Sequence, residues 1–191
     1  MNDMLRKVSW KAAAVQMMVA LVLLCGGAEA KPIEAGLGEI GWDADAKTVE
    51  QVMGKQGFML LDQVKDEAGK TRQRFGYGLY SGFRCEIEVV WQAKHLTEIN
   101  IASTGRLLLG ADAAFQNLVA RLIGEFGQPR EREAHMLKIF PAVWVEGAKW
   151  TVTGNGQPSY DVVVVQNRPA PAPQGDPAGA EGVLVSFIKL Q

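Results

Sequence analysis

The chain of 191 residues carries 20 lysine and arginine residues against 21 aspartate and glutamate residues, which gives a formal net charge of −1. Proteins that bind nucleic acids or anionic membrane surfaces usually carry a clustered basic excess, and this sequence has none. We therefore expect no nucleic-acid partner. The length is within the range of one signal segment and one folded domain.

Residues 1–30 contain the three parts of a secretory signal peptide. Three basic residues before position 12 precede an apolar run over residues 12–24, and small residues at 28 and 30 form a cleavage site. The apolar run is shorter than the roughly 20 residues of a membrane-spanning helix. We predict cleavage after residue 30, a periplasmic or secreted location and no stable membrane span afterwards. The alternatives are an uncleaved anchor and lipidation at Cys25, which the bulky Leu24 disfavours.

The mature chain keeps one cysteine, Cys85, which excludes an intramolecular disulfide. Cys85 alternates with Ile87, Val89 and Trp91, so these side chains share one face of a predicted strand. We interpret Cys85 as a small buried hydrophobic residue. A reactive thiol or an intermolecular bridge is the alternative.

The first half of the mature chain predicts one helix and two hairpins. The helix begins after an aspartate N-cap within residues 42–46 and ends at Gly54 and Gly57. Four extended segments follow, separated by short turns, and predict an antiparallel meander. These segments are residues 58–64, 71–77, 84–91 and 96–103.

The second half repeats this order of elements. An amphipathic helix is predicted from Leu107 to Phe126, and glycine and proline end it. A proline-rich loop over residues 167–182 separates the last two of the four extended segments that follow. These segments are residues 135–140, 143–153, 159–166 and 182–190.

The order of elements predicts a single α+β domain over residues 31–191, with an antiparallel β-sheet that carries two helices on one face. Small and acidic residues lead both helices, and about four strands follow each. This favours a degenerate tandem repeat of a helix and a meander. Two unrelated helices with common capping residues are the alternative.

The richest cluster of aromatic residues lies between the predicted strands, at residues 74–84. Glycine and arginine accompany the rings there, and tyrosine and arginine are typical anchors of protein interfaces. The predicted binding residues are Phe75, Tyr77, Tyr80, Phe83 and Arg84. A core role for some of these rings is the alternative.

Catalytic motifs are scarce. No serine sits in a Gly-x-Ser-x-Gly sequence. Glu131, Glu133 and His135 alternate, so an extended segment would present all three on one face, where they could bind a metal ion. Their spacing of about 6–7 Å along a strand is wide for one ion, and a charged, solvent-facing strand is the alternative. We expect no cofactor, no resident metal and no catalytic residues.

The pattern W-D-x-D-A-x-x-V at residues 42–49, the two hairpins, the helix that ends in Phe126-Gly127-Gln128-Pro129 and the later strands resemble a group of small bacterial envelope proteins. These proteins have the fold of the beta-lactamase inhibitor protein, which outer-membrane assembly lipoproteins of the SmpA/OmlA type share in outline. The resemblance covers most of residues 40–190 and implies this fold more than a function; members of the group bind other proteins or remain uncharacterised. The chain lacks the paired cysteines of the inhibitor and a convincing lipidation motif.

We therefore expect an exported, non-catalytic module that binds another envelope or secreted protein. Two alternatives stay open. The first is a metal-assisted hydrolase that uses Glu131, Glu133 and His135. The second is a small-molecule carrier, which would need a cavity of about 300 Å³ or more.

Overall fold

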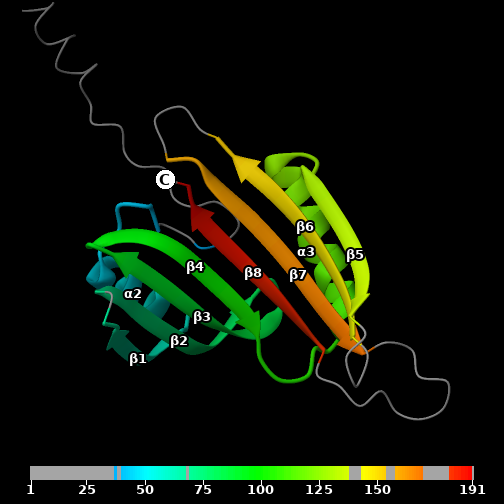
Figure 1. Ribbon diagram of the computed structural model, residues 1–191. Helices are drawn as coiled ribbons and strands as arrows, with labels where there is room; N and C mark the ends of the chain where they lie inside the picture. Colours follow the sequence, from blue (N-terminus) through cyan, green and yellow to red (C-terminus); the bar gives the residue numbers. More distant parts are fainter. Residues whose placement is uncertain are drawn as a thin grey trace, which may run out of the picture.

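The computed structural model describes Leu37 and residues 40–67, 69–137, 143–153, 158–169 and 181–190 (Figure 1). The predicted signal peptide, Cys25 and residues 170–180 of the proline-rich segment lie outside the described residues. The interpretations of these segments therefore stay predictions.

The first half consists of one helix and four strands, as the sequence predicts. Asp45 caps the helix, because its side chain accepts a hydrogen bond of 2.7 Å from the backbone N–H of Thr48. In chain order the elements are α2 (Ala46–Lys55), β1 (Met59–Lys65), β2 (Lys70–Tyr80), β3 (Phe83–Gln92) and β4 (His95–Ser103).

The second half has the same order of elements. Its helix begins three residues later than predicted, because Leu108 and Leu109 form an exposed turn and Gly110 has a φ of 78°. The elements are α3 (Gly110–Phe126), β5 (Glu131–Leu137), β6 (Val143–Val152), β7 (Tyr160–Pro169) and β8 (Gly182–Lys189).

All the strands join one open antiparallel sheet in the order β1-β2-β3-β4-β8-β7-β6-β5. Each half forms a four-stranded meander, and the last strands of the two meanders pair with each other. Ile99 of β4 lies opposite Phe187 of β8, and Ile101 lies opposite Val185. The predicted α+β class and the tandem arrangement of helix and meander are confirmed.

One face of this sheet carries both helices and the hydrophobic core. Strand alternation aligns Ile99, Phe187 and Val162 across three neighbouring strands, and all three are fully buried. Met53 of α2 and Phe115 of α3 belong to the same core cluster. In Figure 1 both helices lie behind the sheet, which confirms the prediction of two helices on one face.

The opposite face, which we call the open face, carries the alternate side chains of the same strands. Among the described residues both helices lie on the other side, so side chains such as Asn100, Ser186 and Val163 stay partly exposed here. No described helix is long and apolar enough to cross a membrane. The open face is therefore the surface on which to look for a site.

Candidate functional site

The structure divides the predicted binding residues into two groups. Phe75, Tyr80 and Phe83 are buried in the core, so the alternative of a core role applies to these three rings and they are not available for binding. The rings of Tyr80 and Phe83 contact each other edge to face, with centroids 5.9 Å apart. Tyr77 and Arg84 are exposed and remain candidates for binding.

The three rings are buried because residues 74–84 do not form one loop. Strand β2 continues to Tyr80 and β3 begins at Phe83, so the two residues face each other across a tight turn. Burial raises the pKa of Tyr80 far above its ordinary value. Arg121 of α3 covers this turn, with its guanidinium 5.7 Å from the Tyr80 ring centroid and 2.6 Å from Ser81 Oγ.

Tyr77 lies in a β-bulge. Phe75 pairs with Ile87 and Gly78 pairs with Cys85, so β2 has one residue more than β3 between these pairs. The φ of Tyr77 is 65° and 82% of the residue is exposed. A left-handed backbone costs a non-glycine residue about 1–2 kcal/mol. The bulge lets both Phe75 and Tyr80 face the core, although their positions in the sequence differ by an odd number, and it leaves the Tyr77 ring exposed. Strained backbone of this kind is often found at functional sites.

The glycines on either side of Tyr77 are there because the chain passes close to neighbouring side chains. A Cβ atom at Gly78 would lie 2.4 Å from the Phe58 ring, and one at Gly76 would lie 2.9 Å from Leu61 Cδ1. Phe58 and Leu61 therefore pack directly against the backbone of β2. This packing holds both sides of the bulge and leaves Tyr77 projecting from it.

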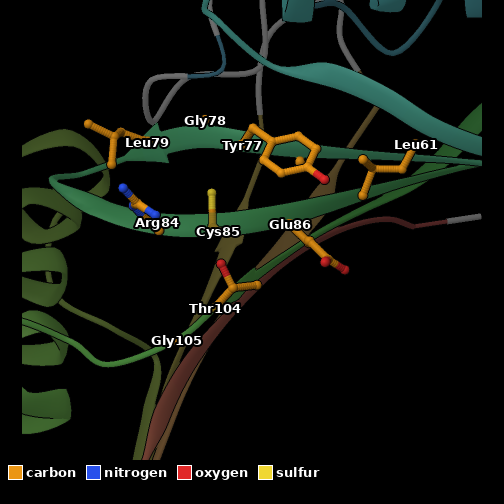
Figure 2. Close-up of a pocket in the computed structure, with 10 residues that line it drawn as sticks. Leu61, Tyr77, Gly78, Leu79, Arg84, Cys85, Glu86, Thr104 and Gly105 are labelled. Atoms are coloured by element: carbon orange, nitrogen blue, oxygen red, sulfur yellow. The ribbon is translucent and has the colours of Figure 1, made fainter.

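A pocket of about 610 Å³ opens beside the bulge, and we call it the Tyr77 pocket (Figure 2). Its wall is apolar on the side of β1 and β2 and polar on the side of β3 and the segment after β4. The apolar side chains are Leu61, Tyr77 and Leu79, and the polar ones are Arg84, Glu86 and Thr104.

The two charged residues of this pocket are not paired with each other. Figure 2 shows Arg84 and Glu86 on either side of Cys85 along β3. Within the described part of the chain, neither side chain has an ion pair or a side-chain hydrogen bond. A bound molecule can therefore pair with either charge without breaking an internal contact.

Cys85 borders the pocket but does not serve it as a nucleophile. The residue is 1% exposed, and burial raises the pKa of its thiol to about 12. The thiol is therefore protonated at neutral pH, and the thiolate is the reactive form. The interpretation of Cys85 as a buried hydrophobic residue is confirmed.

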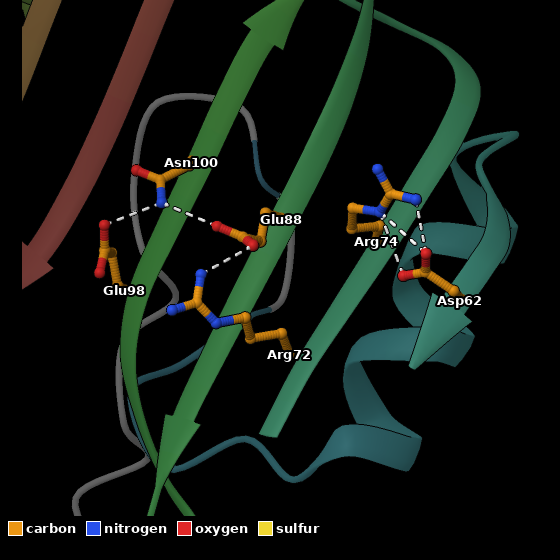
Figure 3. A network of polar contacts seen from close by, with 6 residues as sticks. All are labelled: Asp62, Arg72, Arg74, Glu88, Glu98 and Asn100. Carbon is orange, nitrogen blue, oxygen red and sulfur yellow. Dashed lines mark hydrogen bonds and ion pairs between the residues drawn. The ribbon is translucent and has the colours of Figure 1, made fainter. Parts of the chain in front are cut away.

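The rest of the open face of the first half differs from the pocket, because the charges of its arginines are already paired (Figure 3). Arg74 donates to both carboxylate oxygens of Asp62, and Arg72 lies 3.2 Å from Glu88. Asn100 donates to Glu98 at 2.8 Å and to Glu88 at 3.4 Å. This network spans β1 to β4 and leaves little unpaired charge for a ligand.

Glu131, Glu133 and His135 do share one face of β5, as the sequence predicts, and they line one groove. They do not gather around one point. Among the residues that the structure describes, no group of three histidine, cysteine, aspartate or glutamate side chains is placed to hold a metal ion. The described residues therefore give the metal-assisted hydrolase no support.

This groove, which we call the valine groove, lies on the open face of the second half and has a volume of about 210 Å³. Val145 of β6 and Val163 and Val165 of β7 form its floor. The side chains of β5 form one rim. The valine groove is thus smaller and more apolar than the Tyr77 pocket, and it lies near the other edge of the sheet.

Sequence reasoning identified Tyr77 and Arg84 but missed Leu61, Leu79, Glu86 and Thr104. Alternation in β3 places Arg84 and Glu86 on one face and could have revealed this pair. The bulge carried no such signal, because Gly-Tyr-Gly fits a flexible loop as well as a strained strand.

Comparison of the chain with protein-family models, with curated proteins and with solved structures finds no match.

Proposed function

We propose that this chain is an exported, non-catalytic binding protein of the cell envelope, and that it holds a protein partner at the Tyr77 pocket. The strained, exposed Tyr77 beside that pocket carries the proposal. Tyrosine, leucine and arginine side chains around a hollow match the composition of interface hot spots.

Two further observations support this proposal. The apolar wall of the pocket continues onto β1, an edge strand whose Met59 and Val64 are also exposed. Exposed apolar edge strands are typical sites for pairing with another chain. The resemblance of residues 42–49 and the later elements to small envelope proteins agrees with a protein partner.

Site-specific photo-crosslinking tests the protein partner. A benzoylphenylalanine replaces Tyr77, and in a control protein it replaces His95, which is exposed at the start of β4. We expect a discrete cross-linked protein in living cells at position 77 and none at position 95. Equal cross-linking at the two positions would contradict a site at the pocket.

The export of the chain is tested separately, by mass spectrometry of the protein from a periplasmic fraction. We expect a mature form that begins at Lys31. A full-length or lipid-modified form in the membrane fraction would contradict this part of the proposal.

A small-molecule carrier is the second candidate, because the 610 Å³ volume of the Tyr77 pocket is within the range of ligand sites. Native mass spectrometry of the purified protein separates the two candidates. A carrier is expected to retain a ligand of fixed mass that Tyr77→Ala releases. A protein-binding module is expected to show the mass of the chain alone.

A further inference from the structure

The valine groove has room for a side chain because Gly147 lies in its floor. Gly147 pairs with Glu133 on one side and with Val165 on the other. A Cβ atom there would meet only ordinary contacts, with the Val164 carbonyl oxygen at 3.6 Å and Val165 Cγ2 at 3.8 Å. Neither packing nor a positive φ requires glycine here, so its effect is to leave the groove open.

The rim of this groove carries negative charge that its neighbours among the described residues leave largely unpaired. Lys149 lines the groove, but its ammonium lies 3.0 Å from the carboxylate of Asp161. Within the described part of the chain, Glu131 has one ion pair, of 3.9 Å with the exposed Arg130, and a pair this long and this exposed contributes little. Glu133 forms no ion pair with any described residue.

An apolar floor and an acidic rim suit a long basic side chain. The aliphatic stem of lysine or arginine covers apolar surface while its charged end stays in water beside a carboxylate. The volume of about 210 Å³ is below the range of about 300–1,000 Å³ that is typical of small-molecule sites, so one side chain fits the space better than a whole ligand.

We infer that the valine groove binds a lysine or arginine side chain of a protein partner, with the stem on Val145, Val163 and Val165 and the charged end beside Glu131 and Glu133. This goes beyond the proposed function, because the groove lies on the other half of the sheet from the Tyr77 pocket. A partner that covers the open face could occupy both sites, but each can be tested alone.

Capped peptides test the groove directly. The probe is a seven-residue peptide, Thr-Ser-Val-Lys-Val-Ser-Thr, and two reference peptides carry leucine or glutamate in place of lysine. Titration is followed by NMR of the valine methyl groups of the full mature chain. We expect the methyl signals of Val145, Val163 and Val165 to shift, and the lysine peptide to bind about fivefold tighter than the leucine peptide.

Two variants separate shape from charge. Gly147→Val fills the groove and is expected to abolish the shifts without unfolding the protein. Glu131→Gln with Glu133→Gln keeps the shape and is expected to reduce binding of the lysine peptide to the level of the leucine peptide. Glu50→Gln with Glu67→Gln is the matched control, because both are exposed acids in the first half; it should change nothing.

Three results would overturn the inference. They are the absence of shifts at about 5 mM lysine peptide, equal binding of the lysine and leucine peptides, and unchanged binding by the well-folded Gly147→Val protein. None of these results depends on Tyr77, so the proposed function can stand or fail separately.

Discussion

The two halves of the molecule have the same order of elements but different edges. The edge strand of the second half, β5, presents Glu131, Glu133 and His135 to solvent. Charged side chains are a common protection against pairing with other chains. The edge strand of the first half, β1, exposes Met59 and Val64 instead. One architecture thus leaves an apolar edge in one half and a charged edge in the other.

The bulge adds to this difference. The described part of β5 and β6 pairs in continuous register from Glu131 to Leu137, whereas β2 shifts register against both of its neighbours. The first half holds Tyr77, which has a positive φ within a strand, and the larger of the two pockets. The second half is thus the more regular of the two, and the irregular strand pairing of the first half surrounds the Tyr77 pocket.

The largest effect is expected where the halves join. Phe187 is fully buried on β8 between Ile99 and Val162, and Phe187→Ala should destabilise the protein by about 3–5 kcal/mol. Because both halves contact this ring, urea unfolding should keep a single transition with a lower midpoint. Two separate transitions would show that the halves fold independently.

A matched pair of glycine substitutions sharpens the comparison. Gly78→Ala in the first half places a methyl group 2.4 Å from the Phe58 ring and should destabilise the protein by about 1–3 kcal/mol. Gly147→Ala in the second half meets only ordinary contacts and should be neutral or stabilising by up to about 1 kcal/mol. Thermal denaturation measures both, and equal losses would contradict the close approach at Gly78.

Tyr77→Gly tests whether the strain in the first half serves binding. Glycine tolerates a φ of 65°, so the substitution should stabilise the protein by about 1 kcal/mol in chemical denaturation. The same variant should lose the protein partner proposed for the pocket. If Tyr77→Gly has the stability of the unchanged protein and still binds the partner, neither the strain at Tyr77 nor its role in binding is supported.

The smallest effect concerns acid stability. Arg74 hydrogen-bonds Asp62 in the first half and lowers the pKa of that carboxyl. Burial tends to raise the pKa of Asp161 in the second half, but hydrogen bonds from Lys149 and Thr151 outweigh it, so that pKa is also lowered. The stabilisation that each ionised aspartate gives the folded protein is fully present above the unfolded pKa of about 3.9. It is lost as the pH falls through the lower pKa of the folded protein.

Asp62→Asn and Asp161→Asn should therefore each reduce the loss of stability below about pH 4, compared with the unchanged protein. Urea unfolding at pH 3 and pH 7 measures this. Because Asp62 is more exposed than Asp161, its effect should be the smaller of the two. A larger effect of Asp62→Asn than of Asp161→Asn would show that the more exposed pair, Asp62 with Arg74, contributes more to stability.

The fold was largely predictable because its signals are local. Alternation identified the strands, although β5 begins at Glu131 and not at residue 135 as predicted. An aspartate within residues 42–46 was expected to cap α2, and Asp45 does so. The apolar stripe that includes Phe115 and Leu122 identified α3. The pairing of β4 with β8 was not predictable, because it joins residues far apart in the chain. No local pattern specifies which strands meet across such a distance.

The site was less predictable than the fold. Composition identified Tyr77 and Arg84 but could not separate them from Phe75, Tyr80 and Phe83, because the burial of each ring depends on the bulge and the tight turn. The alternation of Glu131, Glu133 and His135 correctly placed all three on one face. Whether they converge depends on strand geometry, which sequence spacing alone does not give.

The pairing of β4 with β8 also affects when the chain can fold. One side of β4 has no strand to pair with until residues 182–189 have been synthesised. Sheets built from such distant contacts fold slowly, because the entropy of closing a long loop is lost before the contacts form. For a chain that we propose to be exported, this delay would keep the sheet incomplete while translocation begins.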